Sequence, residues 1–230
     1  MSTSISKKIA CAVCQRATIV PLAIPPDNSG SVDLDLRPAS SYRNTMHLWL
    51  QECPVCRYVH SSLDVLLAGA ADIVYTAEYR LMTARETQLG LAGRFMRHAY
   101  LLRDQPFEAG WAMLRAAWVG DDLGRDDLAR YCRRVCDNHW VGLPYGDDEQ
   151  SMLLRAVSVD VLRRARCFFE AGRLAEELLA MQTVTPVLQR ILNFQRQLIS
   201  DFNFAAFTWD AALAAFPGYT EVHAPQKKQA

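Results

Sequence analysis

Four cysteines near the start of this 230-residue chain are the residues whose types and spacing point most directly to chemistry. They form two CxxC pairs, "CAVC" and "CPVC". A CxxC turn can present two thiolates to one ion, and zinc prefers four sulfur or nitrogen ligands in a tetrahedron. The sequence therefore predicts one Zn²⁺ ion bound by Cys11, Cys14, Cys53 and Cys56.

The residues that follow the two pairs, Gln15 and Arg57, are unusual for such turns because glycine commonly occupies this position. A non-glycine residue in the left-handed conformation costs about 1–2 kcal/mol. Structural zinc supplies on the order of 10–16 kcal/mol. The missing glycines therefore do not argue strongly against a zinc site.

Two other interpretations of the cysteines are open. A thioredoxin-type redox motif ends a strand and opens a helix, and only Cys53 and Cys56 have a sequence context that could do so. The two pairs could also be a coincidence. His47 or His60 could replace one of the cysteine ligands. A closed site with four thiolates has no open coordination position, so we expect a structural metal and not a catalytic one.

A second group with metal-ligand chemistry occurs in "CRRVCDNH". Cys132, Cys136 and His139 are spaced i, i+4 and i+7, which places them on one face of a helix. The same spacing is typical of a buried helix face, where cysteine behaves as a small hydrophobic residue. We favour the core interpretation and keep a second metal site as the alternative.

The elements that would hold the four cysteines are strands and turns. Residues 1–57 form a predicted zinc-ribbon-like, β-rich module, with expected strands in "RATIVPLAI", "SVDLDL" and "TMHLWLQ". A unit of this size has too small a core to be stable alone, and a metal could supply the missing stability. Asp33 and Asp35 would share one strand face, either as a cation site or, more simply, as a solvated edge.

Residues 58–215 have helical spacing and predict an α-helical hairpin domain, while residues 216–230 predict a disordered tail. The fold class is therefore mainly α with a small zinc-stapled β-rich module. Tetratricopeptide repeats place small residues where two helices cross. Ala116 and Ala117 could meet Ala129 in this way, and Ala171 with Ala175 repeats the pattern. The separation of 42 residues between Ala129 and Ala171 exceeds the usual period of ~34 residues.

Composition narrows the functional classes. The formal net charge is zero, so no global charge favours nucleic acid or anionic lipid. The first residues lack the apolar run of a signal peptide, and no segment is apolar for the length of a membrane span. Seven cysteines without a secretion signal predict a reduced, cytoplasmic protein. GxSxG, HExxH, P-loop and GxGxxG motifs do not occur, which favours a protein that is not an enzyme.

The segments "CAVC", "DLDLRP", "WLQECPVCRYV", "AAWVGDD" and "LRRARCFFEAG" resemble a bacterial family of uncharacterised proteins that contain a domain of unknown function. That resemblance spans about residues 11 to 199. It implies paired CxxC turns of the zinc-ribbon type in front of a tetratricopeptide-like helical region. It implies no known activity.

These observations predict a zinc-binding, non-enzymatic scaffold whose tetratricopeptide-like surface binds a protein or peptide partner. Two alternatives are a zinc-dependent regulator associated with nucleic acid and a thiol redox sensor that loses zinc on oxidation. The last long helix could cap the helical array or mediate homo-oligomer formation. Four aromatic residues are candidates for the partner surface, although burial in the core would also explain them: Phe95, Tyr100, Trp111 and Trp118.

Overall fold

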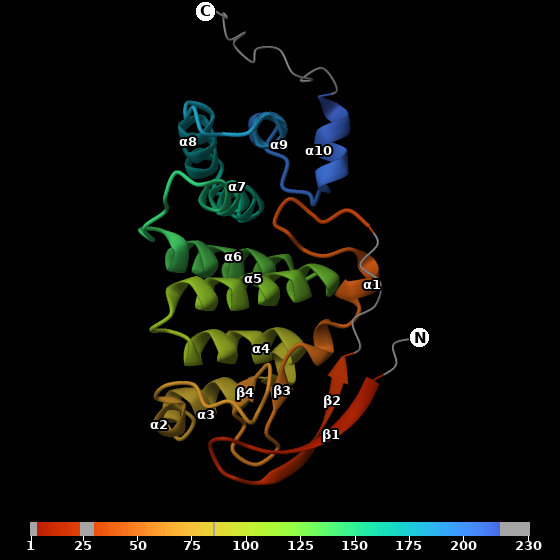
Figure 1. Ribbon diagram of the computed structural model, residues 1–230, viewed down its shortest axis with the longest axis vertical. Coiled ribbons are helices and arrows are strands. Elements are labelled where there is room, and N and C mark those ends of the chain that lie inside the picture. Colours follow the sequence, from red (N-terminus) through yellow and green to blue (C-terminus); the bar gives the residue numbers. More distant parts are fainter. Residues whose placement is uncertain (1–3, 24–29, 85, 217–230) are drawn as a thin grey trace, which may run out of the picture. The chain divides into compact units, whose positions relative to one another are not determined.

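The computed structural model describes residues 4–23, 30–84 and 86–216 (Figure 1). Within these ranges the chain forms ten α-helices and two antiparallel sheets of two strands each. The prediction of a mainly helical fold with a small β-rich part near the cysteines is confirmed.

The two sheets are hairpins whose turns carry the CxxC pairs. Strand β1 (Ser4–Ala10) pairs with β2 (Ala17–Ala23), with Ala10 opposite Ala17 at the turn. Strand β3 (Gln51–Glu52) pairs with β4 (Val59–His60). The strand expected in "RATIVPLAI" is β2, whereas β1 was not expected from its sequence.

Two strands expected from alternating patterns are absent from the described residues. In "SVDLDL", only Asp33 makes an isolated bridge, to Thr208, and Leu36 is left-handed with φ 62°. The polar and the apolar side chains of the alternating pattern are both buried, as Asp33, Leu34 and Asp35 show. The segment therefore has no solvent-exposed face formed by its aspartates. The predicted solvated edge is therefore wrong.

The segment "TMHLWLQ" forms a short 3₁₀-helix, η1 (Met46–Leu48), before it enters β3. Local hydrogen bonds favour this conformation. The Thr45 hydroxyl donates to the carbonyl of Tyr42, and the indole N–H of Trp49 donates to the Thr45 hydroxyl. Side-chain bonds of this kind compete with pairing in a strand.

The first helices are short and are interrupted at glycines. Helix α1 (Ser40–Arg43) precedes η1, and α2 (Ala70–Ile73) and α3 (Ala77–Ala84) follow the second hairpin. Gly69 has φ 70° and lies immediately before α2. Helix α4 (Glu86–Leu101) contains a kink at Gly90, where φ is 52°.

Helices α5 (Pro106–Asp122) and α6 (Asp126–Trp140) form an antiparallel hairpin in which glycines allow close packing. A Cβ atom on Gly110 would lie 2.1 Å from Nε1 of Trp140, and one on Gly120 would lie 2.9 Å from the backbone nitrogen of Ala129. Gly120 meets Ala129 where the two helices cross, and Ala116 and Ala117, the residues expected at this crossing, are buried in α5. Figure 1 shows α4, α5 and α6 packed in succession.

The remaining helices are α7 (Glu149–Arg164), α8 (Phe168–Leu179), α9 (Pro186–Ser200) and α10 (Trp209–Ala215). Arg166, with φ 62°, separates α7 from α8. Their core includes Ala175 of α8, and Ala171 is also buried. A tetratricopeptide-like repeat stays a prediction.

Contacts divide the chain into two units. The first contains residues 1–30 and 37–143, and the second contains residues 31–36 and 144–230. Both predicted boundary residues, 57 and 58, belong to the first unit. The predicted tail from residue 216 lies, except for Phe216, outside the described residues. In the described part of the chain, every helix is too short or too polar to cross a membrane.

In the second unit, the short segment 31–36 is held by a buried ion pair. Nη1 of Arg164 lies 2.8 Å from Oδ2 of Asp35, and both side chains are almost completely buried. Leu34 packs with Ile191 and Leu198 of α9. This carboxylate has an arginine partner, which accounts for its charge without a bound cation.

Candidate metal centre

The first CxxC pair lies in the turn between β1 and β2. The backbone N–H of Gln15 donates to the carbonyl of Cys11 at 2.8 Å, and the N–H of Cys11 donates to the carbonyl of Arg16 at 3.0 Å. Gln15 has φ 60°, the left-handed conformation that reverses the chain after the second cysteine. The turn thus brings Cys11 and Cys14 to one side of the hairpin.

The second pair repeats this geometry between β3 and β4. The N–H of Arg57 donates to the carbonyl of Cys53 at 3.0 Å, and the N–H of Cys53 donates to the carbonyl of Tyr58 at 2.9 Å. Arg57 has φ 65°. From the sequence we considered a left-handed backbone conformation at Gln15 and at Arg57. Both residues adopt it.

The two turns bring the four sulfur atoms together, all within 4.8 Å of one another. Sγ of Cys11 lies 3.6 Å from Sγ of Cys56, and Sγ of Cys14 lies 3.6 Å from Sγ of Cys53. A tetrahedral ion with Zn–S bonds of 2.3 Å places its sulfurs about 3.8 Å apart, whereas a disulfide needs about 2.05 Å. The thiols are therefore spaced for a shared metal ion and not for disulfides.

The protonation of the thiols depends on their burial and on nearby amides. Burial raises the pKa of Cys11 and of Cys56 above the ordinary thiol value. Burial acts in the same direction on Cys14, but the Arg16 backbone amide and the neighbouring thiols outweigh it, and the pKa of Cys14 is lowered. A bound cation would stabilise all four thiolates, because metal ligands must be deprotonated.

The thiols belong to a continuous hydrophobic cluster in the first unit. Cys11 and Cys53 are completely buried, and Cys56 is nearly so. The backbone N–H of Ala12 donates to the carbonyl of Leu63 at 2.7 Å, which connects the first turn to the segment that follows β4. The other members of this cluster come from both hairpins and from α2, α3 and the end of α4, and include Ile9, Val20, Tyr58, Val59, Leu63, Ile73, Tyr79 and Leu101.

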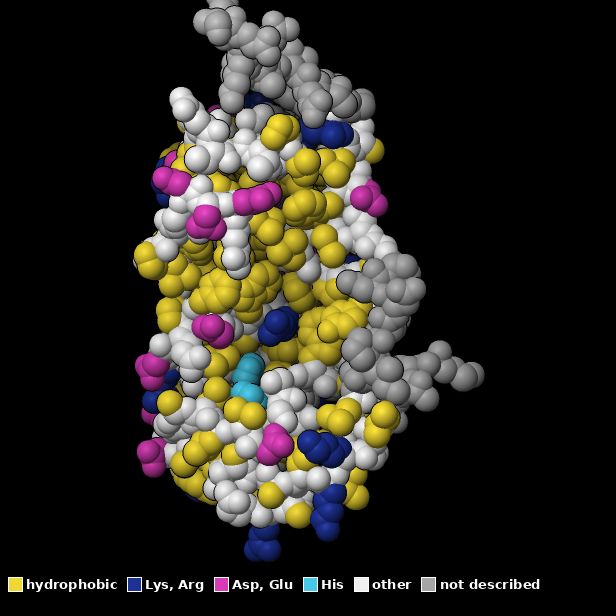
Figure 2. Space-filling model, in the orientation of Figure 1, with side chains coloured by type: hydrophobic (Ala, Val, Ile, Leu, Met, Phe, Trp, Pro, Cys, Tyr) yellow, Lys and Arg dark blue, Asp and Glu magenta, His cyan; other side chains and the backbone are white. Residues whose placement is uncertain are grey.

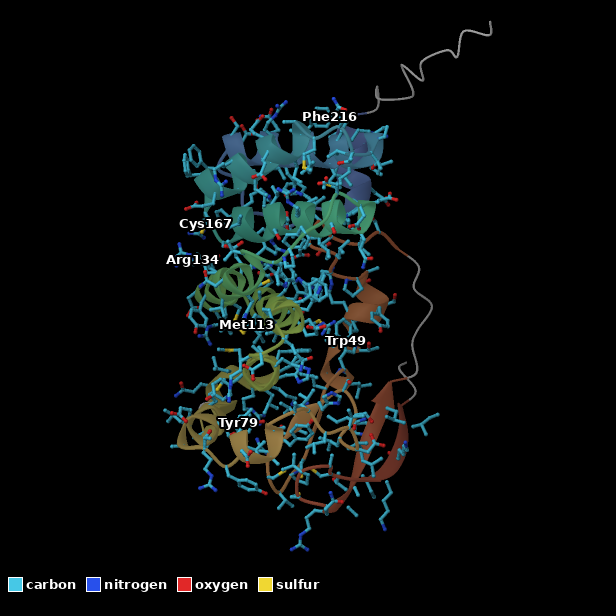
Figure 3. All side chains as sticks on the ribbon, turned by 60° about the vertical axis from the view of Figure 1, so that its left-hand side comes forward. Trp49, Tyr79, Met113, Arg134, Cys167 and Phe216 are labelled. Atoms are coloured by element: carbon cyan, nitrogen blue, oxygen red, sulfur yellow. The ribbon has the colours of Figure 1, made fainter. Side chains whose placement is uncertain are left out.

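Two buried side chains fix the second turn on the helices. The hydroxyl of Tyr79, on α3, and Nη1 of Arg97, on α4, each donate to the carbonyl of Arg57 at 2.8 Å. Nη2 of Arg97 also donates to Oε1 of Glu52 at 2.7 Å. Figure 3 shows Tyr79 in α3, next to the hairpins. Sequence reasoning missed Arg97 and Tyr79, because neither belongs to a motif with the cysteines.

The histidines proposed as substitute ligands lie outside the four-sulfur group. Nδ1 of His47 is 3.1 Å from the carbonyl of Asn44, and Nδ1 of His60 is 2.8 Å from the carbonyl of Ser62. Each ring thus interacts with a nearby backbone carbonyl.

The second predicted group does not assemble as a metal site among the described residues. Cys132 and Cys136 are completely buried in α6, and His139 is half-buried. Burial raises the pKa of Cys132 to about 12 and lowers the pKa of His139. These directions fit a neutral helix face in the core, the interpretation favoured from the sequence.

A thioredoxin-type context is not found at Cys53 and Cys56. Their turn is followed by strand β4 and not by a helix. Among the described residues, the cysteine geometry is that of paired turns of two hairpins, which favours metal binding over disulfide exchange.

Comparison with protein families, curated proteins and solved structures finds no match to this chain. The class that the fold and site define is a mainly helical protein with a four-cysteine group that could hold a metal ion. The bacterial family suggested by its motifs stays a prediction.

Proposed function

We propose that the protein is a non-enzymatic, zinc-binding scaffold for protein–protein interaction. The observation that carries the zinc proposal is the group of four thiols within 4.8 Å of one another. Four thiolates complete the tetrahedron that zinc prefers and leave no position for a substrate or a reactive water. The ion would therefore stabilise the structure.

The role of the ion would be to join the two hairpins to the helices of the first unit. Each hairpin supplies two thiols, and β3–β4 is among the shortest sheets a chain can form. A two-stranded hairpin is marginally stable by itself in water. Metal binding would link these hairpins to the hydrophobic cluster that α2 and α3 complete.

The proposed partner is a protein or peptide, and exposed apolar residues near the second turn support this choice. Val55, between Cys53 and Cys56, is 61% exposed, and Tyr75 is 51% exposed. Both line a hollow of 180 Å³ together with Val74 and Arg80. Apolar and aromatic residues beside an arginine are typical of interface centres.

Two of the four aromatic residues considered from the sequence for a partner surface on the tetratricopeptide-like helices are inaccessible to a partner. Phe95 and Trp118 are buried in the core. Tyr100 and Trp111 are half-buried. The proposed contact surface therefore includes Val55 and Tyr75 in place of Phe95 and Trp118.

Elemental analysis of the purified protein tests the zinc proposal. We expect about one zinc per chain, lost in the double variant Cys14→Ser/Cys56→Ser and retained in Cys167→Ser. Cys167 is a suitable control because it is partly buried and lies outside the four-sulfur group. Metal-free protein, or equal metal in the double variant, would refute the zinc assignment.

The scaffold proposal needs a separate test of the surface. Partners identified by cross-linking in the native cell should be lost in Val55→Asp, with zinc content unchanged. The matched change Val65→Asp replaces another valine, 48% exposed, outside the hollow and should retain them. Loss of partners in both variants, or in neither, would contradict a contact surface at the second turn.

A further inference from the structure

Arg115, on α5, is a cation without an anionic partner among the described residues. Its guanidinium carbon lies 5.9 Å from the centre of the Trp49 ring. Within the described part of the chain, it forms no hydrogen bond and no ion pair. Arg133, on the next helix, shows the usual arrangement, because its guanidinium group lies 2.6 Å from the carboxylate of Asp121. The charge of Arg115 is thus not neutralised by the part of the fold described.

The guanidinium group of Arg115 is partly withdrawn from water and still accessible. Burial lowers its pKa, and the nearby Tyr42 hydroxyl acts in the opposite direction. A cation that loses water without gaining an anion costs free energy, so buried charges are usually paired. The nitrogens of Arg115 are not among the fully buried donors that lack an acceptor in the described residues, so a ligand can reach them.

Two aromatic side chains border this cation. The rings of Tyr42 and Trp49 lie 5.2 Å apart between their centres, with 41° between their planes, and both side chains are partly exposed. The indole N–H of Trp49 donates to the Thr45 hydroxyl at 2.9 Å, which fixes its ring. The Tyr42 hydroxyl has no hydrogen-bond partner in the described part of the chain. Figure 3 shows Trp49 just after η1, on the side of α5.

His98, on α4, also interacts electrostatically with Arg115 but adds no charge. Burial lowers the pKa of His98 to about 4, so its ring is neutral at pH 7. Nδ1 of His98 lies 3.3 Å from the carbonyl of Val59, which fixes the ring. Figure 2 shows histidine and a basic side chain close together in the middle of the visible face, bordered by hydrophobic side chains. Arg115 therefore supplies the positive charge at this position.

We propose that Arg115, Tyr42 and Trp49 form a binding site for a carboxylate carried by a planar apolar group, as in an aromatic acid. A guanidinium group presents a planar fork of donors that matches the two oxygens of a carboxylate. The Tyr42 hydroxyl offers a further donor, and the two rings can pack against the apolar group. All three residues belong to the first unit. The proposal goes beyond the scaffold function and does not depend on it.

The surroundings favour a carboxylate over a phosphate group. A carboxylate brings one negative charge, whereas a phosphate monoester brings about two at neutral pH. Only Arg115 among the four side chains described above is charged at pH 7, because His98 is neutral. An inorganic anion would also leave both aromatic rings without a partner, whereas an aromatic acid contacts the rings and the guanidinium group together.

Calorimetric titration of benzoate into the metal-loaded protein tests the proposal. We expect saturable binding that weakens roughly tenfold in Arg115→Gln, because the charged donor is lost. Tyr42→Phe should weaken binding about threefold, because one neutral donor is lost. The matched variant Arg103→Gln removes an exposed arginine that lies over the ring of Tyr100 at 5.2 Å and should bind as the unchanged protein does.

Comparison ligands separate the charge from the ring. Benzamide keeps the ring and lacks the charge, acetate keeps the charge and lacks the ring, and both should bind more weakly than benzoate. Free aromatic acids and the C-terminal residue of a peptide present the same chemistry. A short peptide that ends in phenylalanine distinguishes these sources: tighter binding than benzoate indicates a peptide C-terminus, and weaker binding indicates a free acid.

Three results would overturn the proposal. The first is no saturable binding of benzoate by the unchanged protein. The second is equal weakening in Arg115→Gln and Arg103→Gln, which would indicate a general charge effect. The third is binding of benzamide or inorganic phosphate as tightly as benzoate. Thermal unfolding and zinc content would show that each variant is folded, and if Arg115→Gln unfolds, Tyr42→Phe and the ligand comparison still decide.

Discussion

Metal affinity at the four-cysteine site should rise steeply with pH. Burial raises the pKa of Cys11 and of Cys56, so without a metal both thiols hold their protons throughout the neutral range. A metal ion binds thiolates and must displace these protons. Lower pH therefore favours the metal-free state, and higher pH favours the bound state.

The size of this effect follows from the number of protons displaced. Cys11 and Cys56 each release one proton when the ion binds, so the apparent association constant gains about a factor of ten per pH unit from each. Together the two protons raise the apparent association constant about 100-fold per pH unit between about pH 6 and pH 8. This corresponds to about 2.7 kcal/mol of binding free energy per pH unit. Because a metal that binds only the folded chain stabilises it, the stability of the loaded protein should rise with pH too.

Competition with a chromophoric chelator at several pH values measures this slope directly. The slope of log affinity against pH should be at least two, after correction for the chelator's own protonation. Cys167→Ser should leave both slope and affinity unchanged, because Cys167 lies outside the sulfur group. A slope of one or less would show that burial does not keep both thiols protonated, and the reasoning from their environment would be wrong.

Three further predictions test the packing around the site. Gly110→Ala should lower the free energy of unfolding by about 2–4 kcal/mol in urea titrations, because the new Cβ would displace Trp140 and break its hydrogen bond to the Phe107 carbonyl. Tyr79→Phe should lower the free energy of unfolding by about 0.5–1.5 kcal/mol and speed the loss of metal to a chelator. The reason is that the Arg57 carbonyl would lose one of its two hydrogen-bond donors. Gln15→Gly should raise the melting temperature of the metal-loaded protein, with a gain of about 0.5–1 kcal/mol, because φ 60° is strained for glutamine.

A control variant and three possible results would test these three predictions. Gly172→Ala should be neutral or stabilising by up to about 1 kcal/mol, since its Cβ would meet Ile199 at an ordinary 3.7 Å. Equal destabilisation by both glycine changes would remove the close-packing argument. Unchanged metal release in Tyr79→Phe would mean that α3 does not support the turn. A lower melting temperature for Gln15→Gly would show that the Gln15 side-chain bond to Ala12 outweighs the backbone strain.

The local part of the metal site could be predicted because a CxxC turn depends on residues close in sequence. The two cysteines of a pair, the reversal after them and its left-handed residue all lie within five positions. Helices with clear limits were predictable for the same reason. Pro106 and Pro186 begin helices α5 and α9, where the fixed φ of proline suits the first turn.

Alternating patterns of polar and apolar residues were less informative about secondary structure. Alternation suggests that neighbouring side chains lie in different environments, but it does not require a β-strand. In "SVDLDL", Asp33 and Asp35 are buried, and Asp35 is paired with Arg164, which lies 129 positions away. No feature of the sequence near Asp35 predicts that Arg164 is its partner. A carboxylate that looks solvated from its neighbours is thus buried by a residue that only the fold supplies.

By itself, the sequence determined the chemistry available at the centre: four thiols in two CxxC turns and a mainly helical body, without a GxSxG, HExxH, P-loop or GxGxxG motif. The tertiary structure decided that the two turns share one group of sulfurs, that Tyr79 and Arg97 hold the second turn, and that Arg115 lies over Trp49. The physical reason is distance along the chain. Bonds within a turn are set by adjacent residues, whereas contacts across 40 or more positions depend on how the hairpins and helices pack, as Arg57 and Arg97 show.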